Sequence, residues 1–153
     1  MTAAGLVIFA VSLIAVDEKA PAQPVSVTMV AVQATREGRP QKSFGPGLEA
    51  VQRALGGLDF DTFVRVQSAE IPSPFGEEQT IRINAKYTLH ITPVSQQEDG
   101  RVRLRARITA VSKDGSQTVN ALDTTLQIKP GMQLNLGGLH LDVGELILVI
   151  SVR

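Results

Sequence analysis

Cysteine and tryptophan are both absent from this chain of 153 residues. Without a thiol, the chain has no disulfide, no thiolate ligand for a metal, no cysteine nucleophile and no lipid anchor attached to cysteine. Aromatic residues are few, five Phe and one Tyr, so Val, Leu and Ile have to fill the core. A hydrophobic content of 43% is enough to build such a core, which argues against a chain that is disordered throughout.

An excess of charge of either sign is also missing, since 15 basic residues balance 15 acidic ones. This balance argues against a general nucleic-acid-binding protein, so any basic site has to be a local patch. The only histidines are His90 and His140. With no cysteine, a zinc site would need carboxylates gathered by the fold. We therefore predict two surface imidazoles and no metal.

No motif for nucleophilic catalysis or phosphate binding is present. Ser26, Ser43 and Ser151 lack the strained turn that a catalytic serine occupies. Two Gly-Gly pairs, at 56–57 and 137–138, are not phosphate loops, because neither joins a strand to a helix with a following Lys and Ser or Thr. We predict that the protein is not an enzyme and has no cofactor; the alternative is an active site assembled from scattered residues that include a histidine.

Three carboxylate pairs fall in predicted turns: Asp59 and Asp61, Glu77 and Glu78, and Glu98 and Asp99. We expect their charges to be solvated. The alternative is that these pairs bind calcium weakly.

The N-terminus resembles an export signal. Residues 5–16 form an uncharged apolar run that is too short to span a bilayer as a helix. Ala20-Pro21-Ala22 then supplies a small-x-small cleavage site before Gln23, although no Lys or Arg precedes the apolar run. We expect residues 1–22 to be a signal peptide and the protein to be periplasmic or secreted. The alternative is a buried first strand or helix.

The strongest pattern is the alternation of apolar and polar residues from Asn84 to Arg153, which is typical of β-strands. Asp99-Gly100 and Asp114-Gly115 are turn signals within it. Residues 145–152 are apolar on both faces, which predicts a central strand buried on both sides. The predicted strands are Thr80–Thr92 with Ile81, Ile83, Ala85, Tyr87, Leu89 and Ile91 on one face, Arg101–Val111, a strand around Leu122–Ile128, a short pair around Gly137-Gly138 within Met132–Leu141, and Glu145–Val152.

The first half reads as a small β-α-β unit over residues 25–69. Its predicted elements are a strand over Val25–Thr35, a helix over Leu48–Leu55 that ends at Gly56-Gly57, and a strand over Phe60–Ala69 with Val64 and Val66 on one face. Residues 80–153 form a predicted β-meander. The fold class predicted for residues 23–153, taken as a single domain, is mainly β (α+β): a β-sandwich or twisted antiparallel sheet with one short covering helix.

A row of basic residues occupies the polar face of the hairpin predicted between Thr80 and Val111. Strand alternation sends these side chains to one side of the sheet. They repel one another unless Asp123, Glu70 or a neighbouring chain neutralises them. One interpretation is an exposed face with surface ion pairs; the functional one is a docking surface for an acidic partner or anionic lipid head groups. The row comprises Arg82, Lys86, His90, Arg101, Arg103, Arg105 and Arg107.

Four pieces occur in the order used by one known family: YTLHITP (87–93), DGRVRL (99–104), DTTLQIKPGMQLNLGGL (123–139) and ELILVISVR (145–153). With them, residues 87–153 resemble the C-terminal domain of bacterial secretins, the outer-membrane ring proteins of secretion systems and type IV pili. The Gly-Gly-Leu after a strand is the most specific feature. The last strand ends in Ser-Val-Arg where the family has Thr-Pro-Arg, and no segment corresponds to the hairpins that build the pore. The resemblance therefore implies a related sheet rather than a channel.

These observations predict a non-catalytic structural or interaction subunit of a bacterial cell-envelope assembly. Its expected partners are proteins of that assembly, including further copies of this chain, with anionic lipid as another candidate. Nucleic acid is not expected, because exposed aromatic residues are not interleaved with the basic ones. The alternative is a soluble periplasmic domain that binds a small or anionic ligand. A concave pocket lined by Tyr87, Phe63 and Phe75 would favour that alternative.

Overall fold

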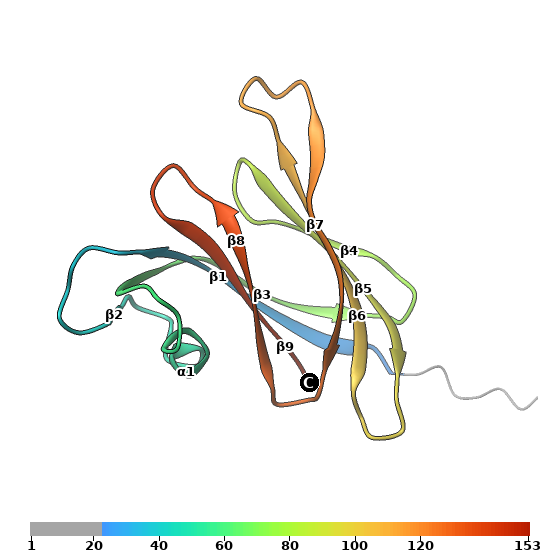
Figure 1. Cartoon of the computed structure of the whole chain (residues 1–153). Helices are drawn as coiled ribbons and strands as arrows, with labels where there is room; N and C mark the ends of the chain where they lie inside the picture. The colour runs from blue at the N-terminus through green and yellow to red at the C-terminus, as the bar shows by residue number, and fades with distance from the viewer. Residues whose placement is uncertain (1–22) are drawn as a thin grey trace, which may run out of the picture.

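The computed structural model describes residues 23–153, so the predicted signal peptide lies outside the described range. Two β-sheets face each other as a sandwich (Figure 1), and the prediction of a mainly β fold with one short helix is confirmed. The five-stranded sheet has the order β2-β3-β1-β9-β8, and the four-stranded sheet has the order β4-β5-β6-β7. The elements are β1 Val25–Thr35, β2 Ser43–Phe44, α1 Gln52–Leu55, β3 Thr62–Ser73, β4 Gln79–Arg82, β5 Tyr87–Gln96, β6 Val102–Val111, β7 Thr118–Ile128, β8 Gln133–His140 and β9 Glu145–Val152.

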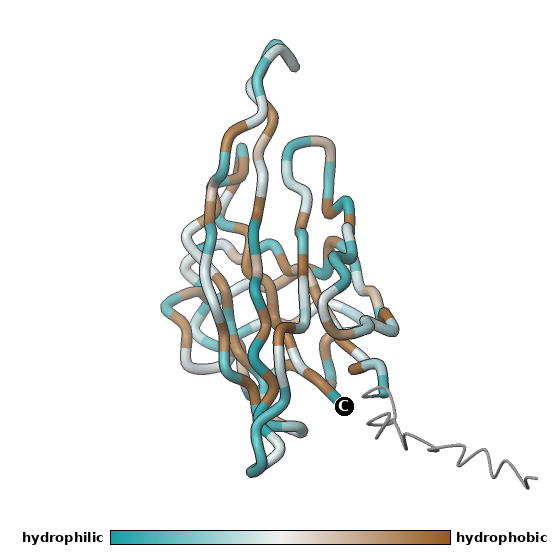
Figure 2. The backbone as a smooth tube through the Cα atoms, turned by 90° about the vertical axis from the view of Figure 1, so that its right-hand side faces the viewer, coloured by the Kyte–Doolittle hydropathy of each residue, from teal (hydrophilic) through white to brown (hydrophobic). Residues whose placement is uncertain are grey.

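The main core lies between the two sheets and is built from the inward residues of each alternating strand. Figure 2 shows hydrophobic and hydrophilic residues alternating along the long strands. On β1, the alternate residues Val25, Val27, Met29 and Ala31 are buried in this core. The alternate residues of β6 are buried there as well: Val102, Leu104, Ala106 and Ile108.

Strand β9 lies between β1 and β8 and is buried on both faces, as its composition predicted. Leu146, Leu148 and Ile150 face the main core. Ile147 and Val149 face a second core on the outer side of the five-stranded sheet. The segment that contains α1 covers this second core with Leu48, Val51 and Leu55. The prediction of a helix over 48–55 is wrong in extent, since only 52–55 is helical, although Leu48, Val51 and Leu55 are all buried.

The two long strands of the first half, β1 and β3, are antiparallel, whereas the short β2 runs parallel to β3. β1 pairs directly with β3, and the helix and the two-residue strand β2 lie between them in sequence. The register of this pair shifts where Ala31 lies opposite Gln67 and Val32 opposite Arg65, so Val66 is an extra, bulged residue. Val64 and Val66, predicted to share a face of this strand, are 48% and 40% exposed.

The prediction of one continuous strand over Thr80–Thr92 is wrong. β4 and β5 are antiparallel neighbours joined by a tight turn, in which the Asn84 side-chain oxygen accepts hydrogen bonds from the backbone N–H groups of Lys86 and Tyr87. A short Asn side chain that bonds to the backbone two residues ahead stabilises such turns. Ala85 lies in the turn and is exposed, whereas the other five residues predicted to face inward are buried.

The last strands also differ from the predicted meander. After β7, the Pro130-Gly131 turn sends the chain to the other sheet, so β8 and β9 belong to the five-stranded sheet and only β4–β7 form a meander. Gly137-Gly138 is not a turn between two strands. The pair lies within β8 opposite the single residue Ile147, as a bulge with Gly138 at a φ of 84°.

Candidate functional site

The predicted basic row lies mostly on the outer face of the four-stranded sheet. His90 on β5 lies opposite Arg107 on β6, and Arg107 lies opposite Asp123 on β7, so these side chains share a face. Arg82 joins the same face because it lies opposite Thr88 on β5, which in turn lies opposite Thr109 on β6. Lys86 and Arg101 occupy turns instead of strands. We call the four strand arginines the basic face: Arg82, Arg103, Arg105 and Arg107.

Carboxylates neutralise two of these arginines. Arg105 Nη2 lies 3.0 Å from Asp123 Oδ2, and Arg107 Nη2 lies 3.5 Å from Glu78 Oε2. The hydrogen bond from Arg105 lowers the pKa of Asp123 from its ordinary value and raises that of Arg105. Asp123 was predicted as a neutralising residue; Glu70 was predicted too, but it binds Arg153 and Ser26 instead.

Glu78 was not predicted as part of this site. It precedes Thr80 and Arg82 at intervals of two residues, so continuing the strand alternation by one step towards the N-terminus would have placed it on the basic face. Its second oxygen, Oε1, lies 3.3 Å from His90 Nδ1. Glu78 therefore connects the β5 histidine to the β6 arginine.

Arg103 is the exception along β6. Its neighbours Arg105 and Arg107 have carboxylate partners, and so does Arg101 in the preceding turn, whose Nε lies 3.2 Å from Asp99 Oδ2. Within residues 23–153, neither Arg103 nor Arg82 forms an ion pair, and both are exposed. Among the described residues, the basic face thus carries four arginines against two carboxylates, which leaves Arg103 at one end of the face and Arg82 at the other without a carboxylate partner.

The histidines are not arranged for metal binding. The two ring nitrogens of His90 form hydrogen bonds with Thr80 Oγ1, at 3.3 Å, and Thr109 Oγ1, at 3.0 Å. Only 17% of the His90 side chain is exposed. His140 lies at the end of β8, in the other sheet. Among residues 23–153, no group of three or more His, Asp or Glu side chains is gathered as a metal site.

One of the three carboxylate pairs considered for calcium, Asp59 and Asp61, already binds groups of the protein itself. Asp61 accepts hydrogen bonds from the backbone N–H groups of Glu37, Gly38 and Arg39, at distances from 2.8 to 3.2 Å. These bonds, the one from Glu37 most of all, lower the pKa of Asp61. Asp59 pairs with Arg36 at 3.3 Å. These two carboxylates therefore hold the loop before β2 in place.

The three aromatic residues proposed for a ligand pocket do not meet. Tyr87 is buried in the main core, whereas Phe63 is buried in the second core on the far side of the five-stranded sheet. Phe75 packs at the margin of the main core and lines an open hollow of about 660 Å³ with Val94 and polar residues. A hollow of about 490 Å³ beside α1 is lined by Glu49, Arg53 and Gln133 and by small residues.

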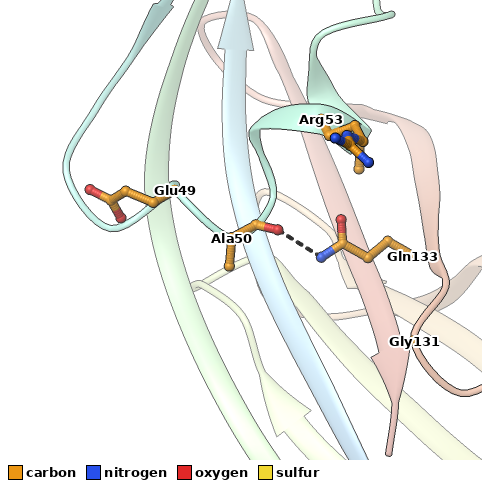
Figure 3. Close-up of a pocket in the computed structure, with 6 residues that line it drawn as sticks. Glu49, Ala50, Arg53, Gly131 and Gln133 are labelled. Atoms are coloured by element: carbon orange, nitrogen blue, oxygen red, sulfur yellow. Dashed lines mark hydrogen bonds between the residues drawn. The ribbon is translucent and has the colours of Figure 1, made fainter.

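That second hollow is a packing feature. Figure 3 shows Gln133 of β8 donating to the Ala50 carbonyl, at 2.9 Å, while Glu49 points away from both. Two residues further along the strand, Asn135 donates to the Ala54 carbonyl at 2.8 Å. Both amides tie the α1 segment to the sheet. No convergent set of polar side chains faces a ligand here.

Comparisons of the chain with protein-family models, with curated proteins and with solved structures give no match. Within residues 23–153, no helix has the length and hydropathy of a membrane-spanning helix. The function is therefore inferred from the geometry and from the sequence expectations.

Proposed function

We propose that this chain is a non-catalytic interaction subunit of a bacterial cell-envelope assembly, and that its basic face binds an acidic surface of a partner protein. The envelope location rests on the export signal expected in residues 1–22 and on the resemblance of residues 87–153 to the secretin C-terminal domain. None of the four basic-face arginines lines either of the hollows described above. A face of this kind suits a protein surface better than an enclosed small ligand.

The unpaired charge of Arg103 is the observation that supports this proposal most strongly. An arginine on a sheet face presents five N–H donors in a planar fork that fits carboxylates. The side chain of Arg105, two residues away, lies on the same face of the sheet. Asp123 already neutralises part of the charge of Arg105. An incoming carboxylate would therefore be held first by Arg103, with Arg105 beside it.

Retention on immobilised poly-glutamate as a function of salt tests the charge preference of the face. Arg103→Gln should elute at clearly lower salt than the wild-type chain, because a charge-assisted contact is lost. Arg101→Gln is the matched control. It removes the same charge from a turn residue that Asp99 already neutralises, so its elution should change less. Equal shifts for both variants would show that only net charge matters and would overturn the role of Arg103.

The partner itself is identified from the native mass of the protein after gentle release from its own cell envelope. A defined large complex is expected, and the double variant Arg103→Gln with Arg105→Gln should be lost from it while remaining folded. If the double variant stays in the complex at wild-type levels, the basic face is not the contact surface.

A further inference from the structure

Strand β7 is an edge of the four-stranded sheet, and its outer side is unpaired. β6 is its only neighbour in the sheet. No hydrogen bond from any described residue outside β6 reaches the backbone of residues 118–128. An edge strand of this kind presents a row of free N–H and C=O groups that a further strand can pair with.

The other edges carry features that obstruct pairing. β8 contains the bulge at Gly137-Gly138, and β4 has only four residues. The two-residue edge strand β2 covers β3 only at Thr62 and Phe63, and the rest of β3 contains Pro72 and the bulge at Val66. β7 has a bulge as well, at Ala121, where the register with β6 shifts. Beyond it, Leu122–Ile128 continues for seven residues without Pro, Gly, Lys or Arg. This segment is the least protected edge among the described strands.

We propose that Leu122–Ile128 pairs with the same segment of a second copy of this chain, antiparallel about a two-fold axis at Thr125. This register is the one that uses all seven residues. A shift by two residues leaves part of the segment unpaired, and a shift by one places inward side chains beside outward ones. On the outer face, Thr125 meets Thr125 of the second copy, and Asp123 meets Gln127.

The side chains of β7 are complementary to themselves in this register. On the inner face, Leu122 meets Ile128 and Thr124 meets Leu126 of the second copy, so apolar side chains lie beside apolar or β-branched ones. Leu122 and Leu126 are only partly buried and pack against the main core, so a second copy would cover apolar surface that remains accessible. No two like charges lie opposite each other, and a Thr–Thr pair is favourable across strands.

Such pairing would make one continuous eight-stranded sheet. Because the two-fold axis of antiparallel strands is perpendicular to the sheet, the basic faces of both copies would lie on the same side. The dimer would present two copies of Arg103 to one partner and bind it more tightly than a single chain. The pairing itself does not depend on the basic face, so the two proposals fail separately: Arg103→Gln leaves the β7 edge unchanged.

The native mass of the full chain in solution tests the pairing. We expect a dimer for the wild type and a dimer dissociation constant raised about tenfold or more by Thr125→Asp, because two carboxylates then meet at the axis. Thr92→Asp is the matched control. Thr92 and Thr125 both lie opposite Arg105 on the same face, but Thr92 belongs to the interior strand β5. Thr92→Asp should therefore remain dimeric.

Mixing provides a second readout that misfolding cannot imitate. Equal amounts of Thr125→Asp and Thr125→Lys should restore a dimer, because opposite charges then meet at the axis. The register is tested by oxidative cross-linking, for which the absence of natural cysteine leaves no background. Thr125→Cys alone should form a disulfide-linked dimer, Gln127→Cys alone should not, and Gln127→Cys mixed with Asp123→Cys should.

Three outcomes would overturn the proposal. The first is a wild-type chain that remains monomeric at micromolar concentration. The second is a Thr125→Asp variant that dimerises as tightly as the wild type or as Thr92→Asp. The third is cross-linking of Gln127→Cys alone at the same rate as Thr125→Cys, which would show random collision.

Discussion

The hydroxyl of Tyr87 donates a hydrogen bond to the carbonyl oxygen of His140, at 2.7 Å, and so links the two sheets of the sandwich. Tyr87 begins β5 in the four-stranded sheet, and His140 ends β8 in the five-stranded sheet. The tyrosine ring is buried in the main core, with only 4% of the residue exposed. The only tyrosine of the chain therefore combines apolar burial with a polar contact between layers.

Tyr87→Phe should destabilise the fold by about 1 kcal/mol, the usual net value of a buried hydrogen bond. The ring and its packing stay in place, so the change isolates the hydroxyl. Urea unfolding of the wild type and the variant measures the difference. An unchanged midpoint and slope would show that water replaces the hydroxyl at the His140 carbonyl without loss.

Gly144→Ala should destabilise the chain more than Gly138→Ala. Both glycines have positive φ, at 77° and 84°, which costs an alanine about 1 kcal/mol. At Gly144 the added Cβ would also overlap the Ala34 carbonyl oxygen and lie 2.6 Å from Thr35 Cγ2, whereas at Gly138 nothing lies within 4 Å. The excess loss at Gly144 should be about 1–3 kcal/mol. Thermal unfolding of both variants checks it; equal losses would mean that the β1 end moves aside freely.

Asp61 should make the stability depend on pH in the acid range. Its pKa in the folded chain is lowered from 3.8 by the backbone N–H groups of residues 37–39, with Glu37 first, so the folded state favours the charged form. The stabilisation is therefore complete above pH 3.8 and is lost as the pH falls through the folded pKa. The wild type should melt above Asp61→Asn at neutral pH, and the gap should close in acid. A gap that is constant with pH would contradict this account.

Sequence patterns failed where two local structures share the same signal. The alternation over residues 80–92 keeps its phase across the Asn84 turn, so Ile83 and Tyr87 are inward on either side of it. A single strand and a hairpin then look alike. Gly137-Gly138 fits a turn or a bulge equally well, since each needs a residue at positive φ, and only the pairing of β8 with β9 decides between them.

The candidate site was partly predictable for a related reason. Alternation placed Arg103, Arg105 and Arg107 on one face, and the structure has them there. The partners that neutralise them come from other strands, and alternation within one strand does not reveal which residues lie opposite. Asp123 reaches Arg105 because the β6–β7 register brings them within 3.0 Å. That register also leaves Arg103 without a carboxylate among the described residues.

The sequence by itself determined which residues are inward on most strands, that β9 is buried on both faces, and where the Asp-Gly turns lie. These properties are local, because side chains alternate along any strand and turn residues act within a few positions. Only the tertiary structure decided the division into two sheets, the crossing from β7 to β8, the Tyr87–His140 link and the free edge at β7. Each depends on which distant strands pair, and that choice is made by the free energy of burying two faces together rather than by local sequence.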